Sequence, residues 1–92
     1  MDTRIGVIAI IISDTEKVSE VNSLLHEARD YIIGRIGIPY KAKNVCVISV
    51  VVDAPNEIIN ALSGKLGQIK GVSSKILVTK WKKTVYSIVF ID

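Results

Sequence analysis

The chain has 92 residues, a formal net charge of +3, one cysteine and 49% hydrophobic residues. This length predicts one domain with a modest core, since a small domain buries only about 60–65% of its unfolded surface. A single cysteine excludes an intrachain disulfide framework and is typical of a reducing cytoplasm, and the mild charge lacks the strongly basic stripe of a dedicated nucleic-acid binder.

The first predicted element is a strand over Ile5–Ile12 (IGVIAIII), in which both alternating sets of side chains are apolar. A strand with one solvated face would alternate apolar and polar residues, so we expect this strand to be covered on both faces. The run is shorter than the about 20 apolar residues that span a bilayer. Asp2 precedes it and no small-x-small cleavage site follows, which argues against a signal peptide. We therefore expect a cytoplasmic protein that does not enter a membrane.

A helix is expected to begin at SDTE (Ser13–Glu16), because serine followed three residues later by glutamate is a capping box. Its buried stripe recurs at helical spacing and consists of Val18, Val21, Leu25 and Ala28. The N–H groups at such a helix start can also hold an anionic group of a ligand. Ser13, Asp14 and Thr15 are therefore candidate ligand-binding residues, although a plain capping box is the favoured interpretation.

From Tyr31 the hydrophobic period changes to two, which predicts a strand. The apolar set is Ile32, Ile36 and Ile38, alternating with Arg35 and Gly37. Pro39 supports extended geometry before it, whereas Gly34 could instead be the glycine just past a longer helix. A polar turn over Tyr40–Asn44 then leads to a second two-faced apolar strand, Val45–Val52.

Pro55 fits the first position of a second helix, where its missing N–H is no loss. The stripe of this helix is Ile58, Leu62, Leu66 and Ile69. Gly71 is expected to cap its C-terminus, and a strand follows over Val72–Lys80. Trp81–Thr84 is a short basic link, and Val85–Ile91 is predicted to form one more strand.

The predicted order β-α-β-β-α-β is that of a ferredoxin-like α+β sandwich, with both helices on one face of an antiparallel sheet. We expect residues 1–92 to form a single domain, with its core over 4–80 and a C-terminal extension over 81–92. Two helices cover one face only, so the second face of Ile5–Ile12 and Val45–Val52 needs a partner's sheet or the terminal strand. Left open, this patch would exceed the few hundred Å² that a monomer tolerates. A homo-oligomer, a dimer or tetramer, is therefore expected.

The segment ALSGKLGQIKGV (Ala61–Val72) carries three glycines within a helical pattern. It does not fit a Walker phosphate loop, because Leu66 stands where that motif needs serine or threonine, and Ile59 where it needs its first glycine. Gly64 and Gly67 are three residues apart and so share one helix face, which would let another backbone or a ligand approach closely. They are candidate ligand-binding residues, the alternative being two exposed glycines without a role.

Groups suited to catalysis or metal binding are few. His26 and Cys46 have no third group that would orient a nucleophile and a base, and no metal-ligand spacing is present. We therefore expect no catalytic residue, no metal and no cofactor. The stretch KWKK (Lys80–Lys83) suits a solvated turn, since three lysines would give only a weak, salt-sensitive contact with phosphates. Direct nucleic-acid binding is not expected.

Three segments carry a resemblance to a known family: VNSLLHEA (Val21–Ala28), RIGIPY (Arg35–Tyr40) and NALSGKLGQIKGV (Asn60–Val72). They resemble the iron-only hydrogenase system regulators, small bacterial proteins, and the similarity extends over about Arg4–Lys80. It implies a ferredoxin-like fold related to ACT domains and to the C-terminal domain of nickel-responsive repressors. Those repressors bind nickel through several histidines and a cysteine, whereas Tyr31–Val52 offers Cys46 and no histidine, so nickel sensing is not implied.

These observations together predict a non-enzymatic, oligomeric, ACT-like regulatory module that binds a small ligand or a protein partner. One alternative is a DNA-associated transcription regulator acting directly or through a partner. The repressors carry a separate DNA-binding domain, for which this chain has no length left. The other alternative is a small enzyme, which the lack of an acid–base or nucleophile constellation disfavours.

Overall fold

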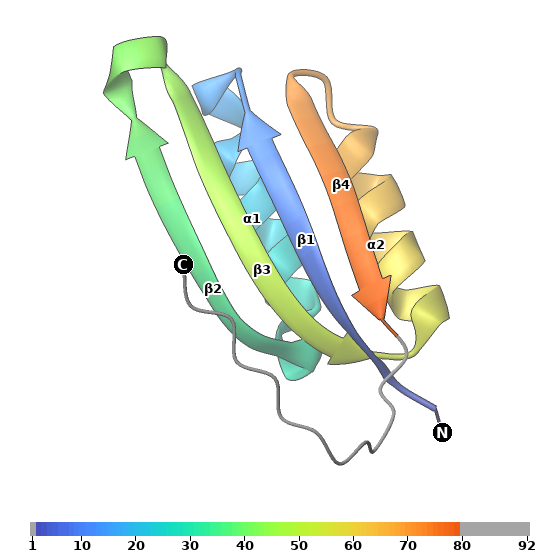
Figure 1. Cartoon of the computed structure of the whole chain (residues 1–92). Coiled ribbons are helices and arrows are strands. Elements are labelled where there is room, and N and C mark those ends of the chain that lie inside the picture. Colours follow the sequence, from blue (N-terminus) through green and yellow to red (C-terminus); the bar gives the residue numbers. More distant parts are fainter. Residues whose placement is uncertain (1, 80–92) are drawn as a thin grey trace, which may run out of the picture.

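A computed structural model of the chain describes residues 2–79. They form a four-stranded antiparallel sheet and two α-helices that lie together on one of its faces (Figure 1). The elements are β1 (Arg4–Ile12), α1 (Val18–Glu27), β2 (Ile32–Tyr40), β3 (Val45–Ala54), α2 (Asn56–Gly67) and β4 (Val72–Thr79). The strand order β2-β3-β1-β4 is that of a ferredoxin-like fold, as predicted. The strand predicted over Val85–Ile91 lies outside the described residues.

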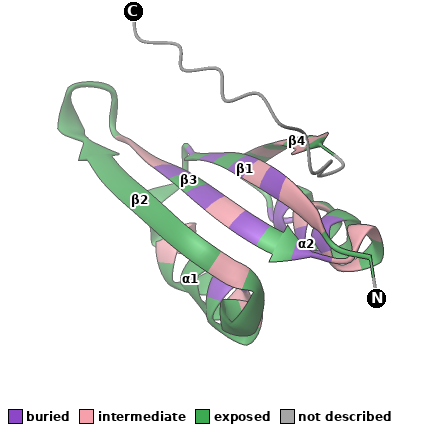
Figure 2. Ribbon diagram, turned by 60° about the horizontal axis from the view of Figure 1, so that its bottom comes forward, coloured by how far each residue is buried: buried purple, intermediate pink, exposed green. Residues whose placement is uncertain are grey.

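The core lies between the sheet and the helices. On the central strand β1, Ile8, Ile10 and Ile12 are fully buried, and each such side chain contributes about 1.5–3 kcal/mol when it leaves water. The helices meet them with Val21, Leu25, Ile59, Leu62 and Leu66, all buried. Figure 2 shows the buried residues concentrated along β1, β3 and the sheet-facing sides of the helices. Neither helix in this part of the chain has the length and apolarity that crossing a bilayer requires.

The other face of the sheet, which we call the outer face, is also rich in apolar side chains. Residues paired in register share a face, which places Ile5, Val7, Ile11, Ile36, Ile38, Val47, Val51 and Leu77 on it. Ile36 is 64% exposed, Ile38 53% and Leu77 70%. The central strands therefore have apolar side chains on both faces, as predicted. Within residues 2–79, no helix or strand covers the outer face.

A bulge in β2 corrects the predicted alternation of that strand. Ile32, Ile36 and Ile38 do not share one face: Ile32 pairs with Val52 on the helix side, while Ile36 pairs with Ser49 on the outer face. The register shifts between Ile32 and Gly34. One extra residue turns every following side chain to the opposite face. Gly34 lies within β2 and does not end a longer first helix.

The ends of α2 also differ from the prediction. Pro55 precedes the helix as its N-cap, with its carbonyl accepting from the amides of Ile58 and Ile59. The helix ends at Gly67, so Gly71 is not its capping glycine. Gly71 instead adopts φ +84° in the turn before β4, where its carbonyl accepts from the amide of Ser13 at 2.8 Å. Gly71 therefore joins the turn before β4 to the end of β1.

Replacing Gly71 by alanine tests this junction. A Cβ at position 71 would lie 2.7 Å from Cβ of Asp14, on a backbone that L residues rarely adopt. We expect Gly71→Ala to destabilise the chain by about 2–4 kcal/mol through left-handed strain and overpacking, measured by chemical denaturation. Gly71→Asn is the control: asparagine tolerates this φ, but it keeps the clash and should also be destabilised. Wild-type stability in both variants would contradict the prediction.

Candidate functional site

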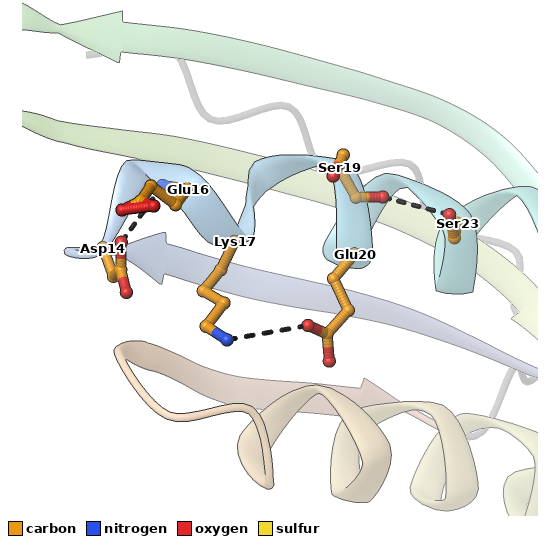
Figure 3. Close-up of polar contacts among 6 residues, drawn as sticks. All are labelled: Asp14, Glu16, Lys17, Ser19, Glu20 and Ser23. Atoms are coloured by element: carbon orange, nitrogen blue, oxygen red, sulfur yellow. Dashed lines mark hydrogen bonds and ion pairs between the residues drawn. The ribbon is translucent and has the colours of Figure 1, made fainter.

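The corner between β1 and α1 contains the first group of predicted ligand-binding residues. Asp14 caps the 3-10 turn Thr15–Lys17, because its Oδ1 accepts from the amide of Glu16 at 3.1 Å (Figure 3). Its carbonyl also accepts from the amide of Lys17 at 2.9 Å. Ser13 does not form the predicted capping box, because its Oγ donates to the carbonyl of Gly71 at 3.0 Å. The turn at Gly71 draws the Ser13 hydroxyl away from the helix start, and the next residue supplies the cap.

This hydrogen bonding limits what the corner can offer to an anion. The amides of Glu16 and Lys17 already donate to Asp14, and the Asp14 carboxylate places a negative charge beside them. Further along, Lys17 Nζ lies 3.9 Å from Oε1 of Glu20 (Figure 3). A ligand-binding role for Ser13 and Asp14 stays a prediction. Thr15 differs from Ser13 and Asp14, because it lines a pocket and they do not.

Gly64 and Gly67 form the second predicted group. Both are exposed, and an added Cβ would meet nothing within 4 Å at either position. They lie on α2 away from its buried residues Ile59, Leu62 and Leu66. Residues 2–79 therefore leave this strip empty. A contact there with a ligand or a second chain stays a prediction, and the two glycines lie apart from Thr15 and its pocket.

A pocket of about 410 Å³ opens between the start of α1 and the end of the β2–β3 hairpin, and we call it the hairpin pocket. Its lining residues are Thr15, Val18, Asn22, Arg35, Gly37, Pro39, Tyr40, Lys41, Asn44, Val45, Cys46 and Ile48. The volume falls in the range of small-molecule sites, roughly 300–1,000 Å³. An apolar floor with a few convergent polar groups is the usual character of such sites, and this pocket has it.

The pocket exists because the helices do not extend over β2. The buried residues of α1, Val21 and Leu25, pack over the central strands, and of β2 only Ile32 is even partly buried. Gly37 adds to the opening: an added Cβ there would lie 3.9 Å from Cγ1 of Ile48 and meet nothing closer. A glycine at this point leaves a space that a larger side chain would fill.

The charges around the pocket are of one sign. Among the residues that the structure describes, its lining contains the two cations Arg35 and Lys41 and no carboxylate. Nη2 of Arg35 donates to Oδ1 of Asn22 at 2.6 Å, which ties β2 to α1 across the opening. Asn22 is neutral, so this hydrogen bond positions the guanidinium without compensating its charge.

A second hollow, of about 500 Å³, lies against α1 and α2 and has mixed charges. Glu20 and Glu27 lie on its rim with Lys65. Its carboxylates make it less suited to an anion than the hairpin pocket.

The structure does not bring His26 and Cys46 together in one site. Cys46 is half-buried and lines the hairpin pocket, while His26 is exposed on α1 and is not part of the lining. Among the described residues no group of three or more His, Cys, Asp or Glu side chains could hold a metal ion. The sequence did not predict a role for the pocket residues Asn22, Arg35 and Lys41, because isolated polar residues on a helix and a hairpin form no motif with a characteristic spacing. The segment RIGIPYK places a cation at each end of an otherwise uncharged stretch, which is a weak signal by itself.

Comparison with known proteins gives one family and a set of similar folds. The TM1266-like family, described as "Iron-only hydrogenase system regulator, putative", matches residues 4–76. The structure of the uncharacterized protein TM1266 from Thermotoga maritima is similar at 40% sequence identity and a TM-score of 0.81, covering 86% of this chain and all of that one. No curated protein matches the chain significantly.

A more distant structure supports the fold alone. A formyltetrahydrofolate deformylase from Pseudomonas putida KT2440 matches at 13% identity and a TM-score of 0.59. The match covers 79% of this chain but only 28% of the deformylase. The same α+β arrangement is therefore used as one part of a much larger protein.

Alanine at Gly64 and Gly67 tests the predicted close approach. If a ligand or second chain packs on this strip, Gly64→Ala and Gly67→Ala should lower stability by about 1–3 kcal/mol, as overpacked contacts do. Because residues 2–79 leave the space empty, such a loss must come from a contact made by something other than these residues. Melting temperature and oligomeric mass are the measurements. A gain of about 0.4–1 kcal/mol with unchanged mass, as at an open helical site, would end the prediction.

Proposed function

Since this chain belongs to the TM1266-like family, described as "Iron-only hydrogenase system regulator, putative", we propose that it is a non-enzymatic, oligomeric, ACT-like regulatory module. In this proposal it binds a small ligand in the hairpin pocket, and ligand binding changes its association with a second copy or with a protein partner. The family name supplies the regulatory role, and the chain's own residues must supply the ligand site.

The hairpin pocket is the observation that carries the proposal. It combines a volume of about 410 Å³ with apolar walls such as Val18 and Ile48 and with polar groups from two different elements, Asn22 and Arg35. A ligand bound there would touch α1, β2 and the hairpin turn at once. Binding can change a protein's state only through differential contacts of this kind.

The absence of a catalytic arrangement in the described residues favours binding over turnover. Of the candidate nucleophile and base, only Cys46 lines the pocket, and no hydrogen bond joins it to His26. Covalent catalysis usually relies on a nucleophile with an adjacent base held in place by a third group, and the described residues bring no such set together at Cys46. A pocket built this way suits a sensor better than an enzyme.

The outer face supports assembly. Its exposed apolar side chains, among them Ile36, Ile38 and Leu77, lie on β2 and β4, the edges of the sheet, with further apolar residues on the strands between. Covering them with a second copy would remove from water a surface that is costly to leave exposed.

A thermal-shift screen of amino acids, nucleotides and organic acids tests the ligand site. A ligand at 100 times its Kd should add about 2.7 kcal/mol of stability, which raises the Tm of a domain this small by about 10–20 °C. Gly37→Val, which fills the pocket without removing a polar group, should abolish the shift. Gly34→Val is the matched control, since Gly34 pairs with Val51 on the outer face. Shifts that survive Gly37→Val would contradict the proposal.

Light scattering tests the assembly. We expect the wild type to be a dimer or tetramer at micromolar concentration, and Ile38→Lys and Leu77→Lys to lower its mass because a lysine in a buried apolar contact is costly. Asn60→Lys, on the exposed side of α2, adds the same charge away from the outer face and should leave the mass unchanged. A stable, non-aggregating wild-type monomer would reject the oligomer and make Val85–Ile91 the candidate cover.

A further inference from the structure

We propose that the hairpin pocket selects small organic anions, carboxylates or phosphates that carry an apolar group, and that Arg35 and Lys41 hold the anionic end. The inference rests on the proposed function for its biological meaning, because it specifies the ligand class of the same site. It depends on three features of the pocket: its charge, the way Arg35 is held, and its apolar floor.

The charge of the lining is the first feature. Twelve residues line the pocket, and they include two cations and no carboxylate. The Glu20 and Glu27 carboxylates border the other hollow instead. The two cations give the lining a net positive charge, which an anion bound in the pocket would compensate. Near a protein surface each close pair of opposite charges gains several times more than it does in bulk water.

The second feature is how Arg35 is fixed. Its Nη2 donates to Oδ1 of Asn22 at 2.6 Å, and within residues 2–79 it forms no ion pair with a carboxylate. A guanidinium has five N–H donors in a planar fork that matches carboxylate and phosphate oxygens. The Asn22 bond uses one donor, orients the plane and leaves the charge uncompensated. Arg29 differs, since its Nη1 donates to the His26 carbonyl at the end of α1.

The third feature is the apolar floor beneath the two cations. Val18 from α1 and Pro39 and Ile48 from the hairpin form it, and Gly37 leaves it deep enough to enter. An inorganic anion would compensate the charges of Arg35 and Lys41 but would leave the apolar side chains of the floor in contact with water. An organic anion covers both, gaining roughly 25 cal/mol for each Å² of apolar surface that it removes from water. The pocket therefore favours an anion with an apolar body over the bare ion.

A pair of fluorescent dyes that differ only in charge tests the proposal. Anilinonaphthalene sulfonate is an organic anion with an apolar body, and phenylnaphthylamine is the same body without the sulfonate. We expect the anionic dye to bind the wild-type protein about a hundredfold more tightly than the neutral one, because each of the two cations adds a charge-assisted contact worth about tenfold. Because either dye could also bind the outer face, only the binding that Gly37→Val removes is assigned to the pocket.

Substitutions locate the charge that is responsible. Arg35→Gln and Lys41→Gln should each weaken the anionic dye about tenfold and leave the neutral dye unchanged. Lys43→Gln is the matched control, because Lys43 belongs to the same 3-10 turn as Lys41 but does not line the pocket. Equal weakening by Lys43→Gln would mean that net charge, not the pocket, attracts the dye, and would overturn the inference.

Competition identifies the anionic group and separates this inference from the proposed function. Displacement of the dye by benzoate or by phenyl phosphate, but not by benzyl alcohol, supports the inference and shows which headgroup is preferred. If benzyl alcohol competes as well as benzoate, and Arg35→Gln has no effect, the pocket is a ligand site without anion selectivity and only the inference fails. If Gly37→Val removes no dye binding at all, the pocket is not a site and both proposals fail.

Discussion

Strand β1 is hydrogen-bonded on both sides, to β3 and to β4, and its inward isoleucines Ile8, Ile10 and Ile12 are fully buried. Both helices pack over this strand and its neighbours, since burying those side chains is the largest favourable contribution available to so small a domain. Two helices cannot also cover β2 or the opposite face of the sheet. The hairpin pocket and the open outer face are both consequences of this one packing constraint.

Strand β2 shows the consequence most directly. It is bonded to β3 on one side only, and nearly all of its residues are exposed. An exposed edge strand is a liability unless something limits its pairing with other chains. Here Pro39 removes one backbone donor and the bulge near Gly34 interrupts the ladder. What the edge retains is a row of side chains that alternate between the two faces of the sheet.

The sequence was sufficient to predict the order of the helices and strands, because their hydrophobic patterns repeat every two to four residues and can be read from short segments of the chain. The sequence did not predict the position of a side chain where that position depends on a bulge or on a residue distant in the chain. The bulge reverses Ile36 and Ile38 relative to Ile32, and the carbonyl of Gly71 takes the Ser13 hydroxyl that a capping box needs. The pocket was not predictable for the same reason. Asn22 and Arg35 are thirteen residues apart in sequence and become a pair only after β2 folds beside α1.

The alternation along β2 relates the two open surfaces to each other. Arg35, Gly37 and Pro39 line the hairpin pocket, whereas Ile36 and Ile38, interleaved with them, lie on the outer face. If a ligand in the proposed site shifted the backbone of β2 at Arg35, the shift would extend to Ile36 and Ile38, because these residues follow in the same strand and are paired with β3. Binding and assembly would then be linked, and linkage is reciprocal: an assembly that prefers one position of β2 changes ligand affinity by the same factor by which the ligand changes assembly.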